Sequence, residues 1–369
     1  MAAGRQDWQA AQERAYRRGR CSTNRGVCAE EEYLINQQRE NKYMEIQKDK
    51  VNVLNEAHGD NWSIYNADCV EGMKMLPSNS VDLSIYSPPF CGMYQYSSSP
   101  RDLSNCESYE DFFDHYEYVV SEIARTTKPG RFTVVHCMDT PKSGSSATIG
   151  GYKDFPGDII RLHEKLGFDF WTRRAIWKEP LAVRLRTMSK GLAHKQICDD
   201  ATLTTVAGAD YILEFRKRGE NAVPVSYPTG LHRYAGEKKI PNEALAWRGY
   251  VGDQKKNRFS HFIWRNYASS IWDDIRISNV LPYEESKDPD DERHVHPLQL
   301  DVIERVVVLR SNEGEVVMTP FMGVGSETYG AALNDRKAIG FELKESYFKQ
   351  AVKNMTGVNS HSNQEDLAL

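Results

Sequence analysis

Long apolar runs, paired cysteines and an apolar leader are all missing from this sequence. No apolar stretch approaches the roughly 18 residues that a membrane span needs. The start of the chain, MAAGRQDWQAAQERAYRRGR, lacks the apolar centre of a secretory signal. The seven cysteines are scattered and form no C-x-x-C pair, which disfavours a zinc knuckle and a disulfide framework. We therefore predict a cytoplasmic protein with reduced thiols, no membrane association and no metal ion.

Charge is nearly balanced over the whole chain but unevenly distributed along it. The 369 residues include 47 Lys and Arg against 52 Asp and Glu, a net charge of −5. Between Arg173 and Arg265, however, 18 basic residues stand against 9 acidic ones, a net charge of +9 that leaves −14 for the rest. A basic segment within an acidic chain predicts a surface for nucleic acid.

Strand-like and helix-like segments alternate on both sides of the basic segment. Residues 59–178 and 284–357 show short apolar strands followed by amphipathic helices, which is typical of a doubly wound α/β fold with a mostly parallel sheet. Residues 179–283 break this rhythm with hairpin-like pieces and loops, and we interpret them as an insert. Residues 1–58 are predicted to form a charged helical arm, either solvated or in contact with DNA or a partner, and residues 358–369 a disordered tail.

A glycine turn in the second half has the features of a cofactor site. Gly323 and Gly325 follow a strand and precede a helix, whose free N–H groups near Ser326 attract an anionic group. Glu342 ends the next strand, where its carboxylate can accept hydrogen bonds from both hydroxyls of a ribose. Thr328 stands where a dinucleotide site has its third glycine, so S-adenosylmethionine fits better than a nicotinamide cofactor.

A second motif, Ser87-Pro88-Pro89-Phe90, follows a strand of the first half. The two prolines stiffen the loop and leave its carbonyl groups as fixed acceptors, to which Ser87 adds a hydroxyl. Such acceptors suit a planar amino group on a heterocycle, and Phe90 can stack on the ring. Accepting both amino hydrogens frees the lone pair of the nitrogen. Either motif alone is commonly an ordinary loop.

In combination, the two motifs resemble those of the DNA amino-methyltransferases, which methylate N4 of cytosine or N6 of adenine. The likeness covers about residues 62–355, and the Ser-Pro-Pro-Phe element precedes the insert while the glycine element follows it. This is the permuted, β-class order of the family. The resemblance implies a Rossmann-like methyltransferase fold, S-adenosylmethionine as methyl donor and double-stranded DNA as substrate.

The resemblance also assigns further cofactor residues. It implies that Asp68 lies near the adenine of the cofactor and that His296 packs over its methionine end. The family usually has Asp-Pro-Phe where this sequence has Thr319, Pro320 and Phe321, and the aspartate holds the methionine amino group. Losing that carboxylate predicts weaker cofactor binding, by about 1.5–3 kcal/mol.

Family members with serine before Pro-Pro mostly modify cytosine, so we predict a site-specific cytosine N4 methyltransferase. Adenine N6 is the alternative, and in either case the base must be flipped out of the duplex. Two other classes stay open. One is a non-catalytic DNA-binding protein on a methyltransferase fold, and the other is an enzyme that methylates a protein amide or RNA.

The insert is predicted to recognise the target through phosphate and base contacts. The residues expected to contact DNA are Arg173, Arg174, Arg184, Arg186, Lys190, Lys195, Arg216, Lys217, Arg218, Lys238, Lys239, Lys255, Lys256 and Arg258. A separate restriction nuclease is a candidate partner. We expect a monomer or homodimer that associates with the nucleoid.

Overall fold

The computed structural model describes residues 51–89, 101–141, 151–187, 190–286 and 297–358. All of them belong to one compact unit, Glu45–Leu369. The predicted tail after Val358 and most of the predicted N-terminal arm lie outside these ranges, whereas Val358 itself is buried in the apolar core. Within them, no helix combines the length and apolar character needed to cross a bilayer.

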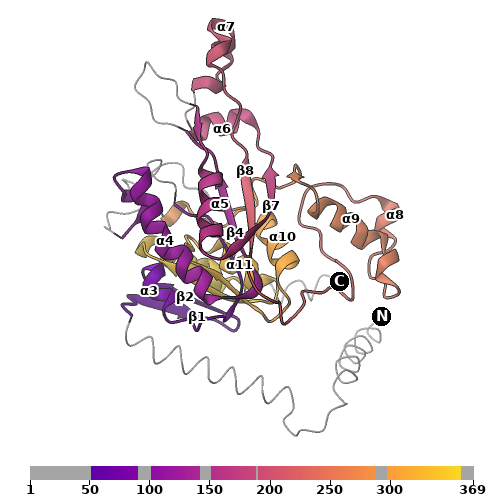
Figure 1. Cartoon of the computed structure of the whole chain (residues 1–369). Helices are drawn as coiled ribbons and strands as arrows, with labels where there is room; N and C mark the ends of the chain where they lie inside the picture. Colours follow the sequence, from indigo (N-terminus) through magenta and orange to yellow (C-terminus); the bar gives the residue numbers. More distant parts are fainter. Residues whose placement is uncertain (1–50, 90–100, 142–150, 188–189, 287–296, 359–369) are drawn as a thin grey trace. The chain divides into compact units, whose positions relative to one another are not determined.

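A nine-stranded sheet forms the framework of this unit (Figure 1). The five strands β2, β11, β10, β3 and β4 are parallel, β1 and β8 run antiparallel to their neighbours, and β7 and β9 run with β4. In spatial order the strands are β1 (Asn55–His58), β2 (Trp62–Asn66), β11 (Lys337–Glu342), β10 (Val316–Thr319), β3 (Val81–Tyr86), β4 (Thr127–Met138), β8 (Asp210–Lys217), β7 (Phe168–Ile176) and β9 (Ile271–Trp272), with β5 (Thr140–Pro141) and β6 (Tyr152–Lys153) as a separate pair.

Helices connect these strands, and side-chain caps begin several of them. Ser108, for example, caps the long helix α4, because its hydroxyl accepts the N–H of Asp111 at 3.0 Å. In chain order the helices are α3 (Cys69–Met73), α4 (Tyr109–Thr126), α5 (Phe155–Lys165), α6 (Pro180–Thr187), α7 (His194–Asp199), α8 (Asn242–Leu245), α9 (Arg258–Tyr267), α10 (Leu300–Arg310), α11 (Ser326–Leu333) and α12 (Glu345–Thr356).

Both faces of the sheet are covered, as the alternation along β3 shows. Leu83 and Ile85 join an apolar cluster with residues of α10, α11 and α12 on one face. The Tyr86 hydroxyl reaches the other face, where it lies 2.8 Å from the hydroxyl of Tyr116 on α4 and 3.3 Å from Nε2 of His163 on α5. Successive side chains of a strand point to opposite faces, so helices lie on both. The predicted doubly wound α/β fold is confirmed.

Two boundaries differ from the prediction. β1 had been assigned to the N-terminal arm, but it forms the edge of the sheet because its backbone pairs with β2, from Asn55 opposite Asn66 to His58 opposite Ser63. β8 had been assigned to the insert, but it lies inside the sheet between β4 and β7. The basic region therefore consists of two separate parts. We call them the 177–209 excursion, between β7 and β8, and the 218–270 segment, between β8 and β9.

The direction of β8 places these two parts at opposite ends of the strands, one at the carboxyl ends of the parallel strands and the other at their amino ends. Ile176 at the end of β7 pairs with Asp210 at the start of β8, so the 177–209 excursion leaves and rejoins the sheet at the carboxyl ends of the parallel strands. Lys217 at the end of β8 pairs with Phe168 at the start of β7, so the 218–270 segment begins at the opposite end of the strands. Figure 1 shows α6 and α7 beyond one end of β7 and β8, and α8 and α9 beside the sheet.

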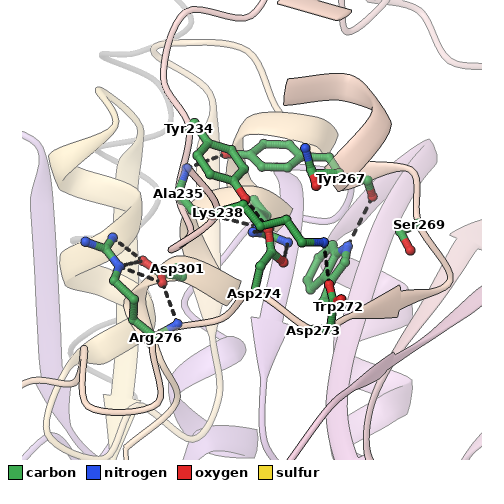
Figure 2. A network of polar contacts seen from close by, with 12 residues as sticks. Tyr234, Ala235, Lys238, Tyr267, Ser269, Trp272, Asp273, Asp274, Arg276 and Asp301 are labelled. Atoms are coloured by element: carbon green, nitrogen blue, oxygen red, sulfur yellow. Dashed lines mark hydrogen bonds and ion pairs between the residues drawn. The ribbon is translucent and has the colours of Figure 1, made fainter. Parts of the chain in front are cut away.

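A buried arginine on α10 fastens the 218–270 segment and β9 to the rest of the unit. Arg305 is fully buried, and its guanidinium donates to Asp274 at 2.9 Å and to the carbonyl of Ala235 at 2.7 Å. It also lies 4.9 Å from the ring centre of Tyr267 on α9. Figure 2 shows the Asp274 carboxylate within this polar network. Because the guanidinium and carboxylate neutralise each other, their removal from water becomes tolerable.

We expect Arg305→Ala to lower the free energy of unfolding by about 3–5 kcal/mol, because Asp274 would stay buried without its cation. Lys238→Ala is the control, since the ion pair between Lys238 and Asp273 is exposed on both sides and should contribute less than about 1 kcal/mol. Urea unfolding curves of both variants measure the difference. Equal, small losses would contradict the anchoring role of Arg305.

Candidate active site

A cavity of about 470 Å³ opens where the parallel strands end. Residues that follow β2, β10 and β3, the last residues of β11 and β4, and the first residue of β8 contribute to its wall. Ligands of α/β folds bind at this edge of the sheet, and the volume is typical of small-molecule sites. In the part of the chain that the structure describes, no group of three His, Cys, Asp or Glu side chains could hold a metal ion.

The Ser-Pro-Pro motif lies at this cavity and makes a contact that was not predicted. Ser87, Pro88 and Pro89 line the cavity, whereas Phe90 lies outside the described residues. Ser87 Oγ is 2.9 Å from Nδ1 of His136 on β4, and Nε2 of His136 is 3.0 Å from Oδ2 of Asp210. We call this set the Ser87–His136–Asp210 relay.

The acceptor at one end fixes the direction of the hydrogen bonds in this relay. A carboxylate only accepts, so in the neutral imidazole of His136 Nε2 carries the ring hydrogen, and Nδ1 accepts the hydrogen of the Ser87 hydroxyl. Lys178 also contacts Asp210, because its Nζ lies 2.6 Å from Oδ2, and the two side chains are 10% and 1% exposed. The oxygen of Ser87 therefore keeps its lone pairs for a ligand in the cavity.

The glycine turn and Glu342 form the other end of the cavity. Gly323 and Gly325 have φ angles of 56° and 94°, a region that residues with a Cβ rarely adopt. Glu342 accepts the backbone N–H of Gly323 at Oε2 and that of Lys344 at Oε1, both at 2.8 Å. Burial raises the pKa of Glu342 to about 7. Each carboxylate oxygen still has a lone pair that can accept a ribose hydroxyl.

The other predicted cofactor residues fall into three groups. Asp68, Pro320, Phe321 and Ser326 line the cavity, and Asp68 also accepts the N–H of Glu71 at the start of α3. Thr319 and Gly325 are not among the lining residues. His296 lies outside the described residues, although the adjacent Pro297 and Leu298 border the cavity.

Thr319, a predicted cofactor residue, does not line the cavity, whereas Glu327 does. Thr319 is 1% exposed, and its hydroxyl is buried without a hydrogen-bond partner behind the wall rather than at its surface. Glu327, which was not predicted as a site residue, lines the cavity from the first turn of α11. The sequence signal that could have found it is an acidic residue directly after the glycine turn.

Several of the predicted DNA-contacting residues lie in two groups, at opposite ends of the sheet strands. Arg184, Arg186, Lys190 and Lys195 belong to the 177–209 excursion, which starts at the cavity. Arg216, Lys217 and Arg218 end β8 or follow it, about 23 Å from Asp210 at 3.3 Å per residue. There Lys217 donates to the carbonyl of Thr127, and Arg218 pairs with Asp169. These three residues therefore lie far from the cavity, and their contact with DNA stays a prediction from the sequence.

Arg174, another predicted DNA contact, is buried beneath the surface. It is 8% exposed and pairs with Glu214 on β8, so the prediction that it contacts DNA is wrong. A sequence pattern counts its charge but does not show its partner. The remaining predicted contacts are exposed: Arg173 on β7, and Lys238, Lys239, Lys255, Lys256 and Arg258 around the 218–270 segment.

Comparison with known proteins identifies the family. The profile of a family described as DNA methylase matches residues 81–353, which is most of the chain. The chain belongs to this DNA methylase family. It is 24% identical to the type II methyltransferase M.BamHI of Bacillus amyloliquefaciens over 79% of this methylase and 57% of that relative. It is also 23% identical to the DNA adenine methyltransferase YhdJ of Escherichia coli K12, over 83% of this chain and 86% of YhdJ.

Solved structures share the fold of this methylase. PvuII DNA methyltransferase, described as cytosine-N4-specific, aligns with a TM-score of 0.53 and 14% identity, over 85% of this chain and 96% of that one. A proposed DNA modification methylase from Thermus thermophilus aligns with a TM-score of 0.51 and 23% identity, over 79% and 93%. These similarities confirm the Rossmann-like methyltransferase architecture.

The methylase is thus a DNA amino-methyltransferase that uses S-adenosylmethionine, and the cavity has groups that fit this cofactor. Glu342 offers acceptors for a ribose. The backbone N–H groups that begin α11 suit the carboxylate of the methionine part. Ser326, at the same helix start, lines the cavity and has a buried hydroxyl that finds no partner among the described residues. A bound polar ligand would satisfy it.

Proposed function

We propose that this methyltransferase modifies N4 of cytosine in double-stranded DNA at a specific site. The observation that supports this most is the Ser87 oxygen, which borders the cavity with its hydrogen directed to His136. A serine before Pro-Pro is the pattern that the family mostly associates with cytosine. The family match supports an enzyme that acts on DNA, rather than a non-catalytic DNA-binding protein or an enzyme for RNA or protein amides.

Ser87 would activate the amino group of the flipped base by accepting one of its hydrogens. The lone pair of an exocyclic amine is delocalised into the ring, and an acceptor for the N–H draws the nitrogen toward a tetrahedral geometry. When bound, S-adenosylmethionine supplies a methyl group on a sulfonium centre for in-line transfer. Positioning and hydrogen bonding by the protein then account for the rate.

The relay also offers a route for the proton that the methylated nitrogen must lose. An N–H bond of the base breaks as an O–H bond forms on Ser87, and the original hydroxyl hydrogen of Ser87 moves to Nδ1 of His136. The carboxylate of Asp210, 3.0 Å from Nε2, stabilises the imidazolium that results. No cysteine takes part, and no covalent intermediate forms.

Nucleoside analysis decides between the two bases. Unmethylated DNA is incubated with the protein and S-adenosylmethionine, digested to nucleosides and analysed by mass spectrometry. We expect N4-methyldeoxycytidine. N6-methyldeoxyadenosine would instead establish the alternative, adenine N6 methylation, which the similarity to YhdJ favours. Absence of both would contradict DNA methylation by this chain.

We propose that the 177–209 excursion forms the DNA face near the cavity. The excursion begins and ends at the carboxyl ends of the parallel strands, where a flipped base would enter the cavity. Its Lys195, on α7, is well exposed. Phosphate contacts by such residues release counterions, so they make binding depend on salt.

The double variant Arg184→Ala, Lys195→Ala should reduce the slope of log affinity against log salt by about 2, roughly 0.9 for each lost phosphate contact. The control is Arg216→Ala, Arg218→Ala, which removes the same charge at the opposite end of the sheet strands. Fluorescence anisotropy with duplex DNA at several salt concentrations measures both slopes. A larger change in the control would place the DNA at that opposite end.

A separate restriction nuclease stays a proposed partner, supported by similarity to type II methyltransferases such as M.BamHI. The monomeric or homodimeric state and a cytoplasmic location near the nucleoid stay predictions from the sequence.

A further inference from the structure

The carboxylate of Glu327 stands out among the acidic groups of the cavity because no residue in the described part of the chain neutralises it. The residue is 5% exposed, lines the cavity and lies in the first turn of α11. Among the described residues, its carboxylate has neither an ion pair nor a hydrogen bond from another residue. Burial, with a smaller contribution from the nearby charge of Glu342, raises the pKa of Glu327 to about 8.

The acidic residues around it have partners, so the lack of one is specific to Glu327. Glu342 holds two backbone N–H groups, Asp68 accepts the N–H of Glu71, and Asp210 pairs with Lys178. An ionised carboxylate buried without a partner is unfavourable by several kcal/mol, and proteins therefore pair such groups or protonate them. A cationic ligand in the cavity would remove this penalty.

The surroundings of Glu327 indicate which part of a ligand lies there. The adjacent Ser326 has a buried hydroxyl with no partner in the part of the chain that the structure describes, and both residues begin the helix whose N–H groups suit a carboxylate. A group that presents a carboxylate and a cation on one carbon is an α-amino acid. The cofactor of this enzyme ends in one, and DNA has no cationic group.

We propose that Glu327 binds the α-ammonium of the methionine part of S-adenosylmethionine. Ser326 and the first N–H groups of α11 bind the carboxylate of that methionine part. This role rests on the proposed methyltransferase function. Glu327 then supplies the carboxylate that the strand end lacks, because the residue there is Thr319, which is buried and does not line the cavity. The predicted weakness of cofactor binding, inferred from Thr319 alone, is offset by an acid eight positions later.

The affinities of two product analogues distinguish the contact at Glu327 from the contacts made elsewhere in the site. S-adenosylhomocysteine has the amino-acid end, whereas 5′-methylthioadenosine keeps the adenine, ribose and sulfur but lacks that end. We expect Glu327→Gln to weaken binding of S-adenosylhomocysteine by about 10- to 100-fold, the range of a hydrogen bond to a charged group. Binding of 5′-methylthioadenosine should change less than about 2-fold, since no contact with Glu327 is lost.

Isothermal titration calorimetry of the full-length protein measures both affinities. Glutamine has the shape of the protonated carboxyl, so the variant should fold, and its binding of 5′-methylthioadenosine reports directly on an intact site. Glu71→Gln is the matched control, because Glu71 also borders the cavity but its carboxylate is already paired with Lys74 at 2.7 Å. It should bind both compounds like the wild type.

Three results would overturn the proposal. Unchanged binding of S-adenosylhomocysteine by Glu327→Gln would show that the ammonium lies elsewhere. An equal loss for both compounds would show a general effect on the cavity. Wild-type protein that binds neither compound would overturn the use of this cofactor as well, a result that is distinct because it does not depend on the variant.

Discussion

Ser87→Ala should lower the rate of methyl transfer by about 100-fold while DNA and cofactor binding stay within about 2-fold of the wild type. The substitution removes the oxygen that accepts the amino hydrogen of the base and the hydroxyl that continues to His136. Both contacts matter most as the nitrogen becomes nucleophilic, so the loss falls on turnover and not on affinity.

A single-turnover methylation assay measures this rate, and calorimetry and DNA anisotropy measure the two affinities. Ser84→Ala is the matched control, because Ser84 lies three residues earlier in β3, where its hydroxyl is buried and donates to Thr133 at 2.6 Å. Ser84 does not border the cavity, so its variant should lose some stability and keep its rate. Wild-type turnover by Ser87→Ala would remove Ser87 from the mechanism.

His136→Ala should slow methyl transfer by about 10- to 100-fold, because the Ser87 hydroxyl loses the acceptor that directs its hydrogen. His136→Asn should retain part of the rate, since its amide oxygen can accept the hydroxyl hydrogen but cannot take up a proton. His136 is a positioning residue that acts through Ser87. Its Nε2 faces the carboxylate of Asp210, which in turn pairs with Lys178.

A double-mutant cycle tests whether the two residues act together. If they do, Ser87→Ala combined with His136→Ala should be no slower than Ser87→Ala alone, because the histidine has nothing left to position. Rate losses that multiply would mean that His136 acts independently, for example by contacting the base. DNA affinity should stay unchanged in all three variants.

The sequence predicted the elements that local patterns define. The strands that end at Ser87, Thr319 and Glu342 were located because each is a short apolar run followed by a turn, and the structure has β3, β10 and β11 at these positions. The positive φ angles of Gly323 and Gly325 likewise confirm the predicted turn. Such features depend on neighbours in the chain, which a sequence pattern includes.

The relay and β8 could not be predicted in the same way, because they depend on distant pairing. His136 and Asp210 are 74 positions apart, and they meet only because β8 pairs with β4, Met138 opposite Asp210. The segment DYILEFRK follows a long basic stretch, and no helix-like pattern comes directly after it in the sequence. The alternation of strands and helices therefore did not assign it to the sheet. The prediction that Arg174 contacts DNA failed for a related reason, since its partner Glu214 lies on that same strand.

The pairing of Ile176 with Asp210 closes the 177–209 excursion at its base. For a loop whose two ends are held together, each doubling of length adds only about 0.6 kcal/mol of closure entropy. Insertions and deletions between these anchors therefore leave the register of β7 and β8 unchanged, and Asp210 stays beside His136. With the DNA face that we propose for this excursion, replacing one closed loop would exchange the recognised DNA sequence without rebuilding the site at its base.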